Sequence, residues 1–201
     1  MQTNEPTPGQ LRRVVFASVI GATIEWYDFF LYGIVAGIVF NKLYFPADDP
    51  VVSTLLAYTT FAIGFVARPL GGIIFGHFGD SIGRKKVLVI ALLIMGVATT
   101  AIGLLPTYHT IGIAAPLILV FLRFVQGLAI GGQWGGATLL VTESAPAAKR
   151  GYYGAYAQAG APAGVILANL AFLAVSNFIP EPAFTEWGWR VPFLASAILI
   201  G

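Results

Sequence analysis

The chain has 201 residues, of which 57% are hydrophobic and only 10% are charged. This composition excludes an ordinary soluble domain, in which about a quarter of the residues are charged. The formal net charge is +2, and the absence of cysteine excludes disulfides and thiolate metal sites.

The N-terminal segment, residues 1–13, is polar and contains prolines and a glycine. We expect it to be a disordered cytoplasmic tail that precedes a transmembrane domain of residues 14–201. Two arginines before the first apolar run superficially suggest a signal peptide. Glu25 and Asp28 interrupt that run and no small-residue cleavage site follows it, so a retained first helix is predicted.

Six apolar runs are predicted to be transmembrane helices, because ~20 residues at ~1.5 Å each cross a ~30 Å hydrocarbon core. They cover Val14–Phe40, Val51–Phe78, Val87–Leu105, Ile111–Glu143, Tyr152–Phe178 and Trp189 to the end. Strand-based spanning is excluded because the runs do not alternate between apolar and polar residues. The last run is too short to cross a bilayer, so we expect a truncated sixth helix and a chain that is half of something larger.

Most of the positive charge lies in alternate connections of this six-span chain. Seven of the 11 Lys and Arg residues fall there: Arg12, Arg13, Arg84, Lys85, Lys86, Lys149 and Arg150. Cytoplasmic loops carry such an excess of cations. The sequence therefore predicts a multi-pass protein of the cell (inner) membrane with its N-terminus in the cytoplasm.

One short segment, FGHFGDSIGRKK at residues 75–86, combines glycines with charges of both signs. Gly79 and Gly83 permit a tight reversal between two helices. The cations fix topology and attract anionic lipid. Asp80 has no part in either role, so a further function is expected for it.

This segment resembles the signature loop of the major facilitator superfamily, in the pattern Gly76-x-x-x-Asp80-x-x-Gly83-Arg84-Lys85-Lys86. The sequence Arg123-x-x-Gln126-Gly127 resembles a second motif of that superfamily. Four further stretches are similar to its metabolite:proton symporter branch: residues 25–29, 65–72, 131–136 and 187–193.

The resemblance implies an all-α membrane protein: the N-terminal six-helix bundle of a major facilitator fold, built from two inverted three-helix repeats. It also implies proton-coupled symport of a small metabolite such as an organic acid by alternating access. The expected partners are a small organic anion or zwitterion, protons, the lipid bilayer and the missing C-terminal six-helix half; no nucleic acid and no cofactor are expected. In this family the loop acts as a latch, which here would join Gly76, Asp80, Gly83 and Arg84 to Glu143.

Four charged residues lie within predicted spans, and each needs a reason because a charge at the bilayer centre costs at least ~2.5–3.5 kcal/mol. Glu25 and Asp28 share one helix face, at a depth similar to that of Arg123. We interpret these three residues and Gln126 as a proton-coupling and substrate site. The resemblance to related proton-coupled transporters implies Asp28 as the favoured partner of Arg123, with Glu25 as the alternative. The alternative is a permanent ion pair that only joins two helices. For Arg68 three alternatives are open: direct contact with substrate, snorkelling towards the cytoplasmic membrane surface, or membership of the latch.

Other function classes are not supported. The sequence has no nucleophile elbow, zinc-protease motif or phosphate-binding loop, which argues against an enzyme. Neither of the two histidines has a metal-ligand neighbour, so no metal site is expected. The remaining alternative is an inactive or structural six-helix fragment that needs a second half to transport.

Overall fold

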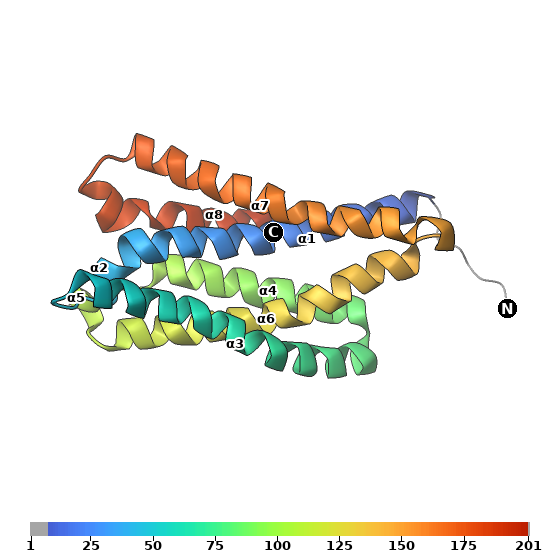
Figure 1. Cartoon of the computed structure of the whole chain (residues 1–201), viewed down its shortest axis with the longest axis horizontal. Helices are drawn as coiled ribbons and strands as arrows, with labels where there is room; N and C mark the ends of the chain where they lie inside the picture. The colour runs from blue at the N-terminus through green and yellow to red at the C-terminus, as the bar shows by residue number, and fades with distance from the viewer. Residues whose placement is uncertain (1–7, 201) are drawn as a thin grey trace.

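The structure is a computed structural model that describes residues 8–200, apart from the side chains at positions 8, 10, 134–140, 143, 147, 157, 199 and 200. Every regular element in this part of the chain is a helix (Figure 1). In chain order they are α1 (Pro8–Val35), η1 (Ala36–Phe40), α2 (Asn41–Leu43), α3 (Pro50–Ile82), α4 (Arg84–Leu104), α5 (Tyr108–Ile111), α6 (Ala114–Ser144), η2 (Ala147–Lys149), α7 (Arg150–Phe178), η3 (Phe184–Gly188) and α8 (Arg190–Ile200).

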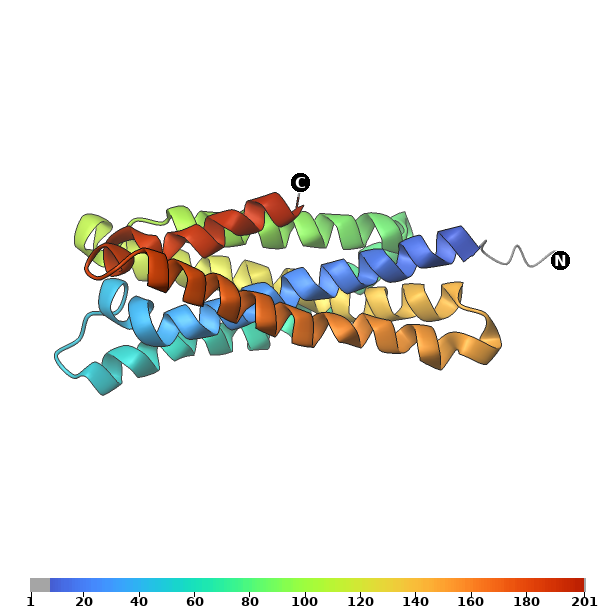
Figure 2. The same cartoon turned by 90° about the horizontal axis from the view of Figure 1, so that it is seen from above.

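Five helical segments are long and apolar enough to cross a membrane, judged by length and composition. They are Leu11–Leu43, Pro50–Ile82, Arg84–Leu104, Ala114–Gln133 and Arg150–Phe178. Helix α8 takes the sixth position with 11 residues and lies alongside α4 (Figure 2). Five full-length runs and one short run are also what the sequence predicts.

The first membrane helix starts earlier than Val14, where the apolar run begins. Helix α1 is described from Pro8 onward, so it includes the six residues before Val14. Residues 8–13 are therefore helical, while the expected disorder of residues 1–7 falls outside the described residues. At its other end, α1 continues without a break through the π-helical turn η1 into α2.

Both ends of α3 follow from local chemistry. At its start, the Asp49 side chain accepts a hydrogen bond from the Val51 backbone N–H at 2.8 Å, with Pro50 at the first helical position. At its end, Gly83 alone connects α3 to α4, with φ at 97°, a conformation that side chains rarely adopt. Gly79, expected to share in this reversal, instead lies within the last turns of α3. The turn at Gly83, η2 and the start of α1 lie at one end of the bundle, which we call the basic end (Figure 1).

The packing follows the internal repeat that the sequence predicts. Helix α1 packs most extensively against α7, and α3 packs to the same extent against α6. The long helices form two sets of three in chain order: α1, α3 and α4, then α6, α7 and α8. The α1–α7 contact joins the first helix of one set to the second helix of the other, and the α3–α6 contact does the same in reverse. This relationship is the one expected for two three-helix units of a transporter half.

Glycines set the close approach within both pairs. A Cβ on Gly164 of α7 would lie 2.6 Å from the Cβ of Trp26 in α1. A Cβ on Gly131 of α6 would overlap the backbone carbonyl of Arg68 in α3. Small residues at such positions let membrane helices approach to backbone contact.

The larger apolar core lies in the half of the bundle away from the basic end. At the end of this core, Arg190 joins α8 to the C-terminus of α4. Its side chain donates hydrogen bonds to the backbone carbonyls of Gly103 and Leu105, both at 2.8 Å. The Tyr44 hydroxyl donates to the same Leu105 carbonyl at 2.8 Å. Burial raises the pKa of Tyr44 to about 12, so this donor stays protonated at physiological pH. The buried Trp189 ring lies against the Arg190 guanidinium.

Candidate functional site

Asp28 of α1 and Arg123 of α6 form an ion pair inside the bundle. The Arg123 Nη1 atom lies 3.3 Å from Asp28 Oδ2, and the two side chains are 3% and 2% exposed respectively. Asp28 is one residue from Tyr27, the middle residue of the span Leu11–Leu43. A charge at that depth is stable only when it is paired and hydrogen-bonded.

Gln126 and Thr99 add hydrogen bonds to this pair, while the buried Nε of Arg123 has no partner among the described residues. The Gln126 amide donates to Asp28 Oδ2 at 3.1 Å and to Thr99 Oγ1 at 2.8 Å, while its carbonyl oxygen accepts from Arg123 at 2.8 Å. The Thr99 hydroxyl lies 2.7 Å from Asp28 Oδ1 and 2.9 Å from the Met95 carbonyl. We call Asp28, Thr99, Arg123 and Gln126 the central network.

Aromatic rings cover the other side of Arg123. Its guanidinium carbon lies 3.8 Å from the centroid of the Tyr32 ring and 5.3 Å from that of Phe61. The Tyr32 hydroxyl in turn forms a 2.5 Å hydrogen bond with Thr60 of α3. The charge of Arg123 is therefore held by one carboxylate and by the negative face of an aromatic ring.

The second pair of charges in the spans, Glu25 and Arg68, lies outside the central network. The Glu25 side chain is buried, at 6% exposure. The Arg68 side chain is half-buried between the rings of Phe65 and Phe29, at 4.4 and 5.2 Å from their centroids. Arg68 feels the charges of both Glu25 and Arg123. The charged side chains in the spans thus lie in two layers along the bundle. One layer contains Asp28 and Arg123, and the other contains Glu25 and Arg68.

The signature segment forms the turn at the basic end. Asp80 and Arg84 lie 3.9 Å apart, with 79% and 42% of their side chains exposed. An exposed pair of this kind contributes at most about 1 kcal/mol to stability. The side chain of Glu143, the expected third member of the latch, lies outside the described residues. Gly76 lies on an open face of α3, and Gly83 forms the turn.

Neither Thr99 nor Tyr32 was predicted to belong to the site. Tyr32 follows Asp28 by four residues, a spacing that places two side chains on the same face of a helix. Thr99 and Thr100 are the two hydroxyl residues in the apolar run 87–105. Both signals were present, but neither identifies a partner on a distant helix.

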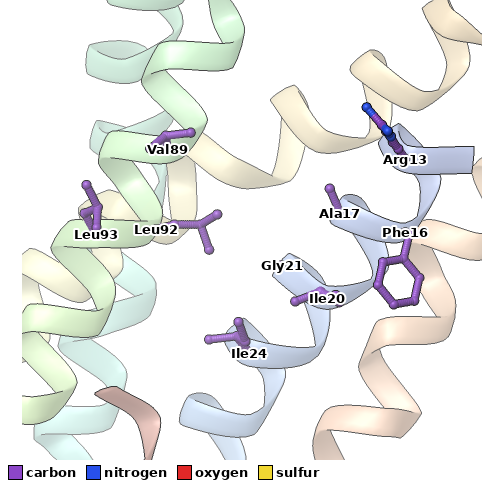
Figure 3. A pocket seen from close by; sticks show the side chains of 9 residues that line it. All are labelled: Arg13, Phe16, Ala17, Ile20, Gly21, Ile24, Val89, Leu92 and Leu93. Carbon is purple, nitrogen blue, oxygen red and sulfur yellow. The ribbon is translucent and has the colours of Figure 1, made fainter. Parts of the chain in front are cut away.

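An apolar groove of about 410 Å³ lies between α1 and α4 toward the basic end (Figure 3). Its lining residues are Arg13, Phe16, Ala17, Ile20, Gly21, Ile24, Val89, Leu92 and Leu93. None of them belongs to the central network, and Arg13 is the one charged residue among them. The groove is therefore distinct from the candidate site. In the described part of the chain, no three His, Asp or Glu residues gather as metal ligands would.

A helical bundle of membrane-spanning length with an ion pair buried at its centre is typical of membrane transport proteins. The chain matches the sugar (and other) transporter family over residues 14–200, and it belongs to that family. The predicted membership of the major facilitator superfamily is thereby confirmed.

Similar proteins of known name are transporters, not enzymes. The chain is 54% identical over 197 residues to the inner membrane metabolite transport protein YhjE of Escherichia coli K12, covering 98% of this chain and 45% of the relative. It is 49% identical to the shikimate transporter of that organism (94% and 43% covered) and 42% identical to its proline/betaine transporter (92% and 37% covered). The chain thus spans less than half the length of these relatives. These matches do not favour the alternative of an inactive fragment.

Solved structures confirm the fold class. The partially occluded inward-open form of the xylose transporter XylE from E. coli matches with a TM-score of 0.83 at 16% identity, covering 94% of this chain and 47% of that structure. Its inward-open form matches with a TM-score of 0.79 at 16% identity, covering 94% and 45%. The bundle is the N-terminal half of a major facilitator fold.

Proposed function

We propose that the chain forms the N-terminal half of a secondary transporter that carries a small metabolite together with protons by alternating access. The observation that carries this proposal is the central network, which is fully buried yet contains a titratable carboxylate. Transporter sites lie near the bilayer midplane between helices of different repeats. Asp28 and Arg123 meet these conditions, because α1 and α6 are the first helices of the two repeats.

Proton coupling follows from the charges of the network. A proton that binds Asp28 removes its negative charge and leaves the Arg123 guanidinium without a counter-ion. The cation must then find another anionic group or move, because an unpaired buried charge is strongly unfavourable. Protonation and rearrangement are thus linked. The competing interpretation, a permanent ion pair that joins α1 to α6, predicts no change in proton binding during transport.

The substrate that suits this site is a small organic anion or zwitterion. The relatives are named for shikimate and for proline and betaine, and each of these molecules carries a carboxylate. A guanidinium is the side chain best suited to recognise that group. Protons and the metabolite are the proposed cargo, and the lipid bilayer is the proposed surroundings.

We place the basic end of the bundle, and with it the N-terminus, in the cytoplasm. The cations of this end, Arg84, Lys85 and Lys86 among them, follow the positive-inside rule. There, Asp80 and Arg84 act with Glu143 as a latch that closes in one conformation and opens in the other. The name of YhjE, an inner membrane metabolite transport protein, supports an inner-membrane location for this chain.

The cavity of this fold lies between two halves, so the chain acts with a second six-helix half. The intact mass of the native protein, extracted from its own membrane, tests this part. A mass of about twice 21.3 kDa supports the proposal. A mass equal to that of the chain shows instead that the second half is a separate protein or is absent.

The function itself is tested with the native protein that contains residues 1–201, reconstituted in proteoliposomes. We expect an inward proton gradient to drive accumulation of radiolabelled shikimate, proline or betaine, and a protonophore to abolish it. Accumulation that ignores the gradient would contradict proton coupling. A lack of uptake of all three, with uptake of a neutral sugar, would contradict the substrate class.

A further inference from the structure

Arg68 is a cation inside a membrane span that has no hydrogen-bond or ion-pair partner among the described residues. Its Nε atom is buried and lacks a hydrogen bond, and none of the described residues forms a hydrogen bond or an ion pair with its guanidinium. A guanidinium has five N–H donors in a rigid fork. Leaving the buried Nε donor unpaired in a membrane span is costly, so an acceptor that is not among the described residues is expected.

The surroundings of Arg68 hold the guanidinium in place without using its donors. The rings of Phe65 and Phe29 lie 4.4 and 5.2 Å from its central carbon. The Arg68 carbonyl faces Gly131, where α3 and α6 are in backbone contact. A guanidinium packed on aromatic faces is pre-organised, so it loses little entropy when it binds an anion.

Arg68 also lies close to the central network. Gly64, one turn earlier in α3, packs against Arg123, since a Cβ on Gly64 would lie 3.6 Å from Arg123 Nε. Four residues along a helix correspond to ~6 Å, so Arg68 is about one turn nearer the basic end. Glu25 is displaced from Asp28 in the same direction by ~4.5 Å. A ligand on Arg68 would therefore be a direct neighbour of the proton-binding layer.

The four charges of the two layers sum to zero when both carboxylates are ionised. Asp28 neutralises Arg123 by direct contact. Glu25 acts on Arg68 through its electrostatic field, and Arg123 repels the same guanidinium. Arg123 donates through Nη1 to Asp28 and Gln126, and its buried Nε has no partner among the described residues. Arg68 differs because none of the described carboxylates forms an ion pair with its guanidinium, so it is the cation that is available to an incoming anion.

We propose that Arg68 is the specificity-determining residue that binds the carboxylate of the transported metabolite. This inference rests on the proposed transport function and adds the atom group that is recognised and the residue that recognises it. The Phe29 and Phe65 rings fix the orientation of the guanidinium. The carboxylate of the metabolite accepts hydrogen bonds from its N–H donors. The central network one turn away then responds to the bound charge.

The test compares each carboxylate with the corresponding carboxamide, which lacks the negative charge, in the purified native protein. Dissociation constants are measured by ligand-dependent thermal stabilisation for shikimate, proline and betaine and for the corresponding amides. We expect the wild type to bind at least one of these carboxylates ten-fold or more tightly than its amide. Arg68→Gln should reduce that ratio below about three-fold, and Arg68→Lys should give an intermediate ratio.

The control variant is Arg190→Gln, because Arg190 also lies against an aromatic ring but uses its donors on two backbone carbonyls. It should lower the melting temperature and leave the carboxylate-to-amide ratio unchanged. The inference is overturned if Arg68→Gln and Arg68→Lys keep the wild-type ratio, or if they weaken acid and amide equally. It is also overturned if the wild type binds none of the three carboxylates. If the Arg68 variants keep the wild-type carboxylate-to-amide ratio and proton-driven uptake is still observed, the proposed transport function stands and only the role of Arg68 is rejected.

Discussion

Asp28 and Arg123 stand 95 residues apart in the sequence, yet their charged groups meet at 3.3 Å in the interior of the bundle. The contact joins the first helix of one repeat to the first helix of the other. Because both side chains are almost completely buried, the pair has energetic consequences that differ from those of a surface salt bridge.

The first prediction concerns the stability of the pair. Arg123→Gln should destabilise the protein by about 3–5 kcal/mol, because it leaves the Asp28 carboxylate buried without its cation. Adding Asp28→Asn should restore much of the loss. Thermal unfolding in detergent measures both effects. A double variant that is no more stable than Arg123→Gln would show that the two charges are not coupled.

The second prediction concerns the contact between α3 and α6. Gly131→Ala should destabilise the bundle by about 1–3 kcal/mol, because the added methyl group overlaps the Arg68 carbonyl. Gly76→Ala in α3 is the matched control, since nothing lies within 4 Å of its Cβ position. The melting temperatures of the two variants should therefore differ, and equal values would contradict the close approach seen here.

The third prediction concerns the hydrogen bonds that join Arg190 of α8 to the C-terminus of α4. Arg190→Gln should cost about 1–3 kcal/mol, because the carbonyls of Gly103 and Leu105 lose a charged donor. Lys42→Gln, at an exposed position near the same end, serves as the comparison. The check is the melting temperature in detergent. If both substitutions have the same small effect, Arg190 does not hold α4 and α8 together.

The fourth prediction concerns the signature turn. Asp80→Asn should impair transport while membrane insertion remains intact, because the exposed Asp80–Arg84 pair adds little to stability. Uptake is measured at matched protein amounts in the membrane, with Lys85→Gln as the neighbouring control. Normal uptake by a well-expressed Asp80→Asn protein would refute the latch.

The helices were largely predictable because continuous apolar runs have one stable form in a bilayer. The end of α3 was also readable at Gly83, where the backbone needs a conformation that glycine adopts freely. The helical conformation of residues 8–13 was not predicted, because these residues precede the apolar run.

The candidate site was predictable only in part. Asp28 and Arg123 were identified because a charged side chain inside an apolar run is energetically costly in a membrane and is therefore usually functional. Thr99 was not identified, because a hydroxyl is inexpensive in a membrane helix and usually bonds to its own backbone, as Thr100 does with Gly96. Only the packing of α4 against both α6 and α1 places Thr99 beside the Asp28 carboxylate.

The central claim is that Asp28 couples proton movement to metabolite transport. The most direct test compares wild type and Asp28→Asn in proteoliposomes, measuring accumulation driven by a proton gradient and exchange at equal pH on both sides. The account predicts that the variant loses accumulation but keeps exchange, because an amide resembles the protonated acid and cannot release a proton. Intact gradient-driven accumulation by Asp28→Asn would contradict it.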